Sequence, residues 1–482
     1  MLRQVSDNGI SYEFCIEMLH HRTINETSGR FCIEIDSRQP ICPIEVDGRH
    51  AGYMIGCAVN LNKGTTVHDR LILSPAKDAT ALANQALDEL SGSFLLLIIY
   101  AGEIWAYPDA SATIGLVYSP DLRRAGSSAM AVLRSDYDAL LQRDLIRAFG
   151  ANNDGWFTAG LTAHTGLYRL LPNHGLNLTT WQMERFWPQQ MPSYRQDIDQ
   201  PLREIGKEID IVISAIARDH LVTQTLTGGN ETRAVLACNS KKSQTEFMTL
   251  SLPVSGLDVY LATKLSKLVG LTHNITKGVR ADERLMEAWL KSAGHGVSGM
   301  NAIWSPSVSK FKGRYLIGGL GGEVGRGFLW PSDLQGDEVI DSGMILTLLK
   351  LPQHQLLLPA VENWLKTLPV GLDAFQVLDL AYLELRLGPW AYGQPRLATG
   401  PTDISPLISR RQFKRMWSLP PKFRKSPGFL PKLVEMHDPS LLTVPINRYG
   451  DYRDNFTSFI RAVRRPDRAL RKFKQILRLR KL

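Results

Sequence analysis

The stretch LTGGNETRAVLA, residues 226–237, places two glycines between two apolar segments and follows them with an asparagine, a carboxylate and a hydroxyl residue. The run LVTQTL before the glycines predicts a short strand, and the run from about Thr232 predicts a helix. Backbone N–H groups are free where a helix begins, and glycine lets an anion approach the main chain closely. The stretch therefore predicts a phosphate site at a strand–helix turn, with a plain tight turn as the alternative. The GK[ST] ending of a Walker loop is missing.

Strand and helix patterns alternate around this turn. FMTLSLP predicts a strand, DVYLATKLSKLVG from Asp258 predicts a helix, and Gly270 predicts the next turn. An amphipathic helix over residues 201–220 is predicted by the apolar positions Leu202, Ile205, Ile209, Val212 and Ile216. This alternation is typical of a doubly wound parallel sheet, covered on both faces by helices.

The first 190 residues have a different pattern, with short apolar or alternating runs separated by Gly, Asp and Pro. They predict a β-rich domain, a layered sandwich with helices outside. FLLLIIY and EIWAY, split only by Ala101 and Gly102, predict a hairpin. Residues 188–201 have the proline-punctuated composition of a linker. We therefore expect one domain over residues 1–190 and a second over 191–460.

The bulk composition is that of a globular protein. A chain of 482 residues with 44% hydrophobic and 21% charged residues predicts two or three domains. Its longest apolar run, FLLLIIY, is far shorter than the ~20 residues of a membrane helix, and the start of the chain lacks a secretory pattern. The five cysteines form no CxxC pair, which favours reduced thiols and a cytoplasmic location.

The net charge of +9 is concentrated at the C-terminus. Residues 461–482 carry that whole excess, so the rest of the chain is balanced and no specific nucleic-acid binding is expected. The apolar positions Leu470, Phe473 and Leu477 predict a basic amphipathic helix in this tail. It suits an anionic membrane surface or a partner protein, and packing on the preceding domain is the plainer interpretation.

Several segments together resemble the asparagine synthetase family of ATP pyrophosphatases. TGGNETR is similar to the family's SGGxDSR loop, and GGLGGEVGRGF, residues 318–328, is similar to its second signature, SGxGGDExxGGY. FMTLSLP and DVYLATKLSKLVGLTH resemble the strand and helix that follow the loop. ISPLISRRQFKRMWSLPPKFRKS resembles the segment that carries a basic residue facing the reaction centre.

The N-terminal half shares the resemblance. GSFLLLIIYAGEIWAYPDASATIGLVYS and LYRLLPNHGLNLTTWQMERFW are similar to parts of the family's glutaminase domain. The resemblance implies an α/β protein in which an Ntn-hydrolase-like α+β sandwich precedes a PP-loop synthetase domain. Position 2 is Leu2 where the glutaminase has its nucleophilic cysteine. The first cysteine, Cys15, lies in the middle of a segment and not beside a terminal amine that would activate it. We therefore expect the fold without glutamine hydrolysis.

The resemblance also implies site residues. Two family aspartates that bind Mg²⁺ correspond to Glu231 and Glu323, and the β-lactam synthetase tyrosine corresponds to Leu320, so that branch's proton relay is not expected. The basic candidates near the reacting groups are Arg233, Arg424 and Lys425, with Lys422 and Arg326 as weaker ones. The residues expected to hold ATP are Thr227, Gly228, Gly229, Asn230, Glu231, Thr232, Leu250, Gly319, Gly321 and Gly322.

The expected function is an ATP- and Mg²⁺-dependent, AMP-forming amide ligase that activates a carboxylate of a small molecule or peptide. Peptide cyclisation, as in the related lasso-peptide cyclases, or surface-polysaccharide assembly would provide such substrates. Two alternatives remain: a scaffold or binding protein that kept the fold, and an amidotransferase that receives ammonia from another subunit. The bland interpretation of Glu231 and Glu323 is that of surface carboxylates beside an empty loop.

Overall fold

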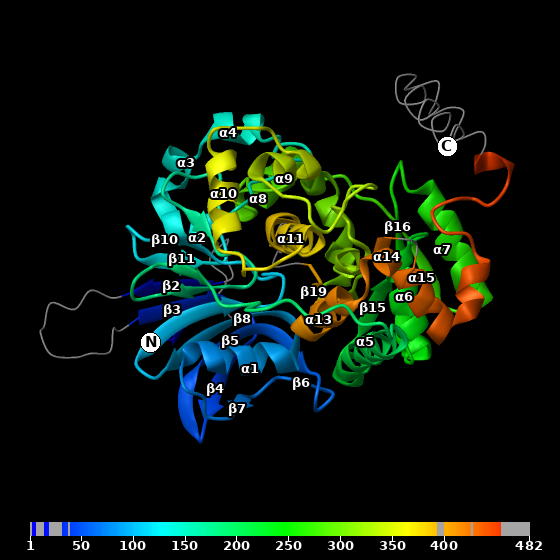
Figure 1. The fold of residues 1–482 in the computed structure, drawn as a ribbon, viewed down its shortest axis with the longest axis horizontal. Helices are drawn as coiled ribbons and strands as arrows, with labels where there is room; N and C mark the ends of the chain where they lie inside the picture. Colours follow the sequence, from blue (N-terminus) through cyan, green and yellow to red (C-terminus); the bar gives the residue numbers. More distant parts are fainter. Residues whose placement is uncertain are drawn as a thin grey trace, which may run out of the picture.

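The chain forms a mixed α/β structure with three sheets (Figure 1). The computed structural model describes residues 2–5, 14–18, 31–36, 39–392, 400–425 and 428–454. The predicted basic helix in residues 461–482 lies outside these residues.

Two mostly antiparallel sheets fill the N-terminal part. The smaller sheet has the order β1 (Leu2–Val5), β3 (Phe31–Asp36), β2 (Phe14–Met18), β11 (Arg124–Gly126), β10 (Val117–Ser119) and β12 (Tyr168–Arg169). The larger has the order β14 (Met183–Arg185), β13 (His174–Asn177), β9 (Glu103–Pro108), β8 (Leu90–Tyr100), β5 (Arg49–Asn60), β4 (Ile41–Val46) and β7 (Leu71–Leu73), with β6 (Thr65–Thr66) beside β5.

The two sheets pack face to face, because alternate residues of their strands share one core. Ile16 and Ile33 of the smaller sheet and Leu95 and Leu97 of the larger one are fully buried in the same cluster. On the outer faces lie α1 (Ala79–Glu89), against the larger sheet, and α2 (Ala129–Leu133), against the smaller. The short η1 (Arg134–Asp136), α3 (Tyr137–Leu140) and α4 (Arg143–Ala148) follow α2.

The predicted hairpin is confirmed between β8 and β9. Tyr100 pairs with Glu103, so Ala101 and Gly102 alone form the turn, with φ values of 54° and 79°. Two successive positive φ angles are those of a type I′ turn, whose twist matches that of the strands.

The third sheet is the predicted parallel sheet. Its order is β17 (His273–Lys277), β16 (Thr245–Ser251), β15 (Val222–Thr225), β18 (Tyr315–Ile317) and β19 (Thr402–Ile404), and every pair is parallel. The chain adds strands outward from β15 in one direction and then returns to add β18 on the other side. Ligands of open α/β sheets bind beyond the carboxyl ends of the strands at such a reversal. The fold therefore directs attention to the loops after β15 and β18.

The predicted amphipathic helix is confirmed as α5 (Asp199–Asp219), and its apolar stripe is buried. The helix after the glycine turn is α6 (Asn230–Cys238), which begins two residues earlier than predicted because it starts directly after Gly229. The other helical segments are η2 (Lys242–Gln244), α7 (Gly256–Leu268), α8 (Glu283–Ser292), η3 (Gly299–Phe311), η4 (Gly322–Arg326), α9 (Ser342–Leu349), α10 (Leu357–Lys366), α11 (Ala374–Ala381), η5 (Tyr382–Leu387), α12 (Gly388–Tyr392), α13 (Arg410–Ser418), α14 (Pro421–Lys425), α15 (Phe429–His437) and η6 (Pro439–Thr443).

Both faces of the parallel sheet are covered. Phe247 of β16 and Ile317 of β18 are fully buried in the large core that also contains the inner faces of α5 and α6. Their neighbours Met248 and Leu316 point the other way and pack against Phe311 of η3. The strands are therefore buried on two sides, as a doubly wound sheet requires.

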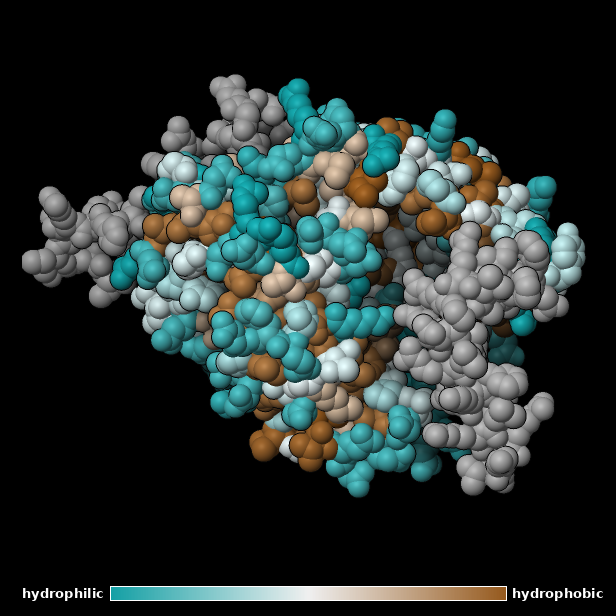
Figure 2. Space-filling model, turned by 90° about the horizontal axis from the view of Figure 1, so that it is seen from above, coloured by the Kyte–Doolittle hydropathy of each residue, from teal (hydrophilic) through white to brown (hydrophobic). Residues whose placement is uncertain are grey.

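Among the described residues, no helix combines the length and the apolar composition that crossing a bilayer would require. The face seen from above in Figure 2 mixes polar and apolar side chains in small patches and is hollowed between its middle and right-hand parts.

Candidate functional site

The two glycine-rich segments singled out in the sequence meet beyond the carboxyl ends of β15 and β18. A Cβ atom added to Gly319 would lie 2.8 Å from Cβ of Glu231, and one added to Gly322 would lie 2.9 Å from Cγ of Glu231. Gly321 between them has a φ of +98°. The second segment therefore consists of glycines because the stem of Glu231 packs directly on its backbone, and because one residue takes a left-handed conformation.

The first glycine turn is held in shape by its own side chains. The Thr227 and Thr232 hydroxyls are hydrogen-bonded at 2.9 Å, and Oγ1 of Thr232 also accepts the Thr227 N–H at 3.1 Å. Oδ1 of Asp258, in the first turn of α7, accepts the Gly228 N–H at 2.9 Å. Two threonines and one aspartate thus fix the turn before any ligand binds.

The free amides lie one step further along, at the start of α6. No side chain caps this helix at Gly229, whose own N–H donates to Oγ1 of Thr227 at 3.3 Å. The uncapped N–H groups of the first turn carry the positive end of the helix dipole. Oδ1 of Asn230 is buried there with no hydrogen-bond partner among the described residues, and as an acceptor it suits a donor or a cation. The uncapped N–H groups are what give the start of α6 the properties of an anion site.

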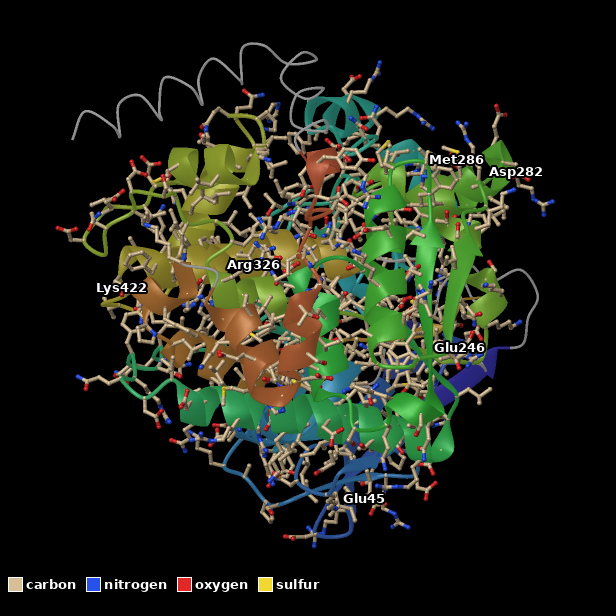
Figure 3. All side chains as sticks on the ribbon, turned by 90° about the vertical axis from the view of Figure 1, so that its right-hand side faces the viewer. Glu45, Glu246, Asp282, Met286, Arg326 and Lys422 are labelled. Atoms are coloured by element: carbon tan, nitrogen blue, oxygen red, sulfur yellow. The ribbon has the colours of Figure 1, made fainter. Side chains whose placement is uncertain are left out.

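Glu231 and Glu323 are electrostatic neighbours across the meeting of the two segments. Burial raises the pKa of Glu323, and the charge of Glu231 raises it further. Oε2 of Glu323 accepts the N–H of Gly321 at 3.1 Å. Nε of Arg326 donates to Oε1 of Glu231 at 3.0 Å, and this ion pair is partly exposed. Figure 3 shows Arg326 near the middle of the molecule. Two carboxylates thus share one partly closed place, where a cation would relieve their repulsion.

Arg233 is fully buried, and its guanidinium binds backbone carbonyls. Nη1 donates to the carbonyls of Leu441 and Val444, and Nη2 donates to those of Pro445 and Gly228. The N–H of Asn447 adds a bond to the Gly228 carbonyl at 3.1 Å. Arg233 therefore fastens residues 441–447 over the glycine turn, and its Nε is buried with no partner among the described residues.

Arg424 is also fully buried and lies beneath the second glycine segment. It makes two hydrogen bonds of 2.7 Å to the carboxylate of Asp379 and donates to the carbonyls of Val324 and Gly325 in η4. The face of its guanidinium lies 4.4 Å from the ring centre of Trp330. These contacts make Arg424 a support of the segment that carries Glu323.

Other predicted residues lie on the surface or at the margin of the site. Lys425 and Lys422 of α14 are exposed, and Figure 3 shows Lys422 at the edge of the molecule, away from Arg326. Leu250 is partly buried near the carboxyl end of β16, where it packs with Met248.

Two residues were missed in the list drawn from the sequence. Asp258 was noted only for its spacing, although it holds Gly228; a carboxylate in the first turn of a helix after a parallel strand is the signal that identifies it. Tyr382, at the start of η5, is buried with its ring 4.9 Å from that of Phe328, and burial raises its pKa well above the ordinary value. Its place depends on tertiary packing, and nothing in its sequence surroundings indicates it.

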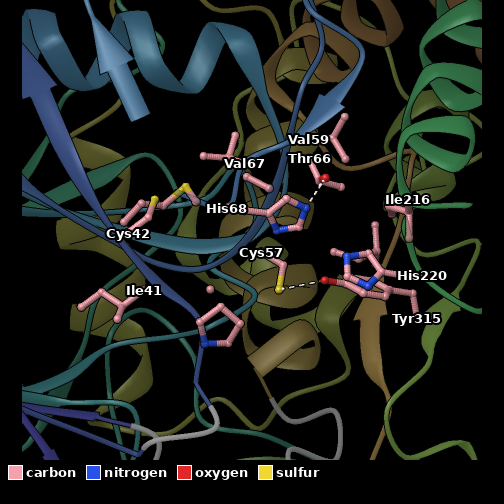
Figure 4. A pocket seen from close by; sticks show the side chains of 15 residues that line it. Ile41, Cys42, Cys57, Val59, Thr66, Val67, His68, Ile216, His220 and Tyr315 are labelled. Atoms are coloured by element: carbon pink, nitrogen blue, oxygen red, sulfur yellow. Dashed lines mark hydrogen bonds between the residues drawn. The ribbon is translucent and has the colours of Figure 1, made fainter. Parts of the chain in front are cut away.

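A separate cavity of about 250 Å³ lies at the other end of the parallel sheet (Figure 4). It is lined by β5 and β6 of the larger sheet and by Tyr315, the first residue of β18. Cys57 and the Tyr315 hydroxyl are hydrogen-bonded at 3.4 Å, and the His68 and His220 rings meet at 5.5 Å. Its lining contains no carboxylate and none of the predicted nucleotide residues, so it is distinct from the glycine site.

Cys15, the first cysteine of the chain, lies in β2. Burial raises the pKa of its thiol to about 11, and the thiol donates to the carbonyl of Ala131. A thiol of this kind is protonated at neutral pH and is a poor nucleophile.

Comparison with known proteins gives little. No protein-family model and no curated protein matches this chain. Among solved structures it is similar to the NMN synthetase from Francisella tularensis, with 12% sequence identity over 39% of this chain and 93% of that one. The TM-score is 0.21, too low to bear on fold or function.

Proposed function

We propose that this protein is an ATP-dependent, AMP-forming ligase that activates a carboxylate and passes it to an amine. The observation that carries the proposal is the meeting of two glycine-rich segments at the strand-order reversal, with Glu231 and Glu323 between them. A parallel sheet that places an uncapped helix start there favours a phosphate ligand. The PP-loop resemblance of these segments supports ATP as that ligand.

Mg²⁺ fits this pair of carboxylates. Mg²⁺ uses one or two protein carboxylates and completes its shell with water and substrate phosphates. The described residues hold no group of three or more His, Cys, Asp or Glu side chains suited to a metal. Glu231 and Glu323 would hold the ion, and its chemistry would be to neutralise charge on the leaving pyrophosphate. Arg326 would then give up its bond to Glu231.

In this reaction a substrate carboxylate oxygen bonds to the α-phosphorus of ATP as the bond to pyrophosphate breaks. An amine then attacks the acyl carbon, AMP leaves, and the amine loses a proton. The start of α6 would hold the phosphates, while the bonds of Thr227, Thr232 and Asp258 keep the turn preorganised. We assign Arg233 and Arg424 to positioning, because their terminal nitrogens donate to carbonyls and to Asp379. Lys425 remains a candidate only through the resemblance.

Two alternatives lead to different experiments. The ion pair between Arg326 and Glu231 favours a scaffold or binding protein, since it satisfies the first carboxylate without a metal. An amidotransferase fed with ammonia by another subunit would share the nucleotide site and differ in its amine. The acyl substrate, a small molecule or a peptide, the cytoplasmic location and a role of residues 461–482 at an anionic membrane or a partner protein remain proposals drawn from the sequence.

The test is nucleotide binding by the full chain, followed by product analysis. We expect calorimetry to detect Mg²⁺·ATP, and Glu231→Gln to weaken its affinity at least tenfold while the thermal unfolding midpoint stays near that of the unaltered chain. The exposed Glu283→Gln on α8 is the matched control and should bind normally.

Chromatography after incubation with carboxylates and amines separates the alternatives. AMP and pyrophosphate that appear in equal amounts support the ligase, and formation only with added ammonium identifies the amidotransferase. If the unaltered chain binds no ATP at millimolar concentration, the proposal is wrong and the scaffold reading replaces it.

A further inference from the structure

Arg386 is a partly buried cation that the proposed reaction has not used. It lies in η5, four residues after Tyr382, and its Nη1 atom is buried with no hydrogen-bond partner among the described residues. Arg424 and Arg185 have carboxylate partners, Asp379 and Glu384, whereas Arg169 and Arg233 also have buried N–H groups without a partner among the described residues. A buried donor without an acceptor is destabilising, so an unmet donor on an arginine points to a ligand where other contacts hold its guanidinium in place.

Two indole rings lie against the guanidinium of Arg386. Its central carbon lies 4.1 Å from the ring centre of Trp156 and 4.5 Å from that of Trp390. Trp156 is itself fixed, because its Nε1 donates to the carbonyl of Leu385 at 2.9 Å. Cation–π contacts use the face of a guanidinium, whereas its N–H donors lie in its plane. The in-plane edge is therefore the part left for a ligand.

Arg386 belongs to the surroundings of the two carboxylates. The ring of Tyr382 contacts that of Phe328, and the guanidinium of Arg326 lies 5.0 Å from the ring centre of Phe328. Arg326 in turn pairs with Glu231. Burial lowers the pKa of Arg386, while the charges of Tyr382, Glu323 and Asp154 act in the opposite direction. Arg386 is thus an electrostatic neighbour of Tyr382 and Glu323, and the contacts of Tyr382, Phe328 and Arg326 lead from there to Glu231.

We infer that Arg386 binds a carboxylate of the acyl substrate through the free edge of its guanidinium. This inference rests on the proposed function, because it makes Arg386 a specificity residue of the same site. A planar fork of N–H donors matches a carboxylate with two parallel hydrogen bonds, and the flanking indoles keep the fork in one orientation and exclude water. The substrate class is thus an acid whose carboxylate reaches the side of Trp156 and Trp390. The phosphates of ATP are the other source of a matching oxyanion, and the experiment separates the two.

The test uses the indole N–H signals of the ten tryptophans in the full chain, labelled with nitrogen-15 and recorded by NMR. Trp156→Phe and Trp390→Phe assign the two signals beside Arg386. Glutarate and benzoate are the carboxylate probes, pyrophosphate is the phosphate probe, and sodium chloride matches the ionic strength. We expect glutarate or benzoate to shift the two signals saturably. Arg386→Met should abolish this shift, and Arg386→Lys should weaken the affinity about tenfold, because it keeps the charge and loses the fork.

The exposed Arg284→Met on α8 is the matched control and should behave like the unaltered chain. The eight other indole signals report whether Arg386→Met keeps the fold. If they stay unchanged while the shift is lost, the variant has lost binding and not its structure. The inference is wrong if pyrophosphate alone gives a saturable shift, or if none of the three probes gives one. Calorimetry with Mg²⁺·ATP keeps the two proposals apart: Arg386→Met should bind ATP normally, whereas failure of ATP binding by the unaltered chain refutes the proposed function and leaves the carboxylate result to be judged by itself.

Discussion

Gly319 shows at the level of one residue how the two glycine segments depend on each other. A Cβ atom at this position would lie 2.8 Å from Cβ of Glu231 and 2.9 Å from the backbone nitrogen of Thr232. These are atoms of a helix start and of a side-chain stem, which cannot move aside without displacing α6. Gly318 next to it has nothing within 4 Å of the same point.

Gly319→Ala should therefore destabilise the protein by about 1–3 kcal/mol, the usual cost of overpacking, and should weaken Mg²⁺·ATP binding strongly. Urea unfolding and calorimetry measure the two effects. Gly318→Ala is the control, and we expect it to change neither by much. Equal behaviour of the two variants would mean that the segments do not touch as described.

At the level of elements, the glycine turn is covered by residues 441–447, and hydrogen bonds from Arg233 hold the two together. Four carbonyls share its two terminal nitrogens, and burial lowers its pKa to about 10, so it stays charged at neutral pH. The buried side chains of Leu441 and Val444 also hold this segment, so loss of Arg233 should loosen it locally without releasing it.

Arg233→Met should leave these carbonyls without donors and cost on the order of 3 kcal/mol. Hydrogen exchange should accelerate in residues 439–447 and at Gly228, while β8 and β9 keep their protection. Arg280→Met, at an exposed position, serves as the comparison. Unchanged exchange over residues 439–447 would show that other contacts hold this segment.

At the level of the whole molecule, a buried carboxylate joins the N-terminal sheets to the C-terminal helices. Glu384 of η5 is fully buried and accepts hydrogen bonds from Arg185 of β14 at 2.7 and 2.6 Å, from Asn173 at 2.7 Å and from Trp364 at 2.6 Å. Burial by itself would raise the pKa of Glu384, but Arg185, His174 and Asn173 outweigh it and lower the pKa. Residues distant in sequence thus compensate one charge.

Arg185→Met should destabilise the protein by about 3–5 kcal/mol at pH 7, because it leaves a buried charge without its partner. The pH dependence of the contribution of Glu384 to the free energy of unfolding should change sign. In the unaltered chain Glu384 contributes stability above the pKa of the unfolded state, and this is lost as pH falls through the lowered folded value. In Arg185→Met burial dominates, so the contribution of Glu384 declines as pH rises instead. Denaturant unfolding of the unaltered chain and of Arg185→Met between pH 4 and pH 8 measures the two pH dependences.

Arg70→Met is the control for this comparison, because Arg70 pairs with Glu45 at the surface with 57% of its side chain exposed. Such a pair contributes about 0–1 kcal/mol, so its loss should be small at every pH. Similar losses for both variants would contradict the role given to the buried pair.

The sequence by itself determined the local elements. The hairpin over Ala101 and Gly102, the helix over residues 199–219 and the strand–turn–helix at Gly228 follow from period, turn residues and chain-local hydrogen bonding, which depend on neighbours in the chain. The pairing of the two glycine segments was suggested by resemblance, and the placement of Gly319 and Gly322 against Glu231 agrees with it.

Only the tertiary structure decided what the long side chains do. Arg233 and Arg424, chosen from the sequence as catalytic candidates, are buried among carbonyls and Asp379. Arg386, which no motif marks, lies against two indoles and has a donor without a partner among the described residues. The physical reason is that a guanidinium reaches several ångströms from its backbone and takes partners from distant segments, as Arg233 does from Pro445, 212 positions away in the chain. Local pattern fixes where the backbone turns, whereas the partners of a charge are fixed by packing between distant segments.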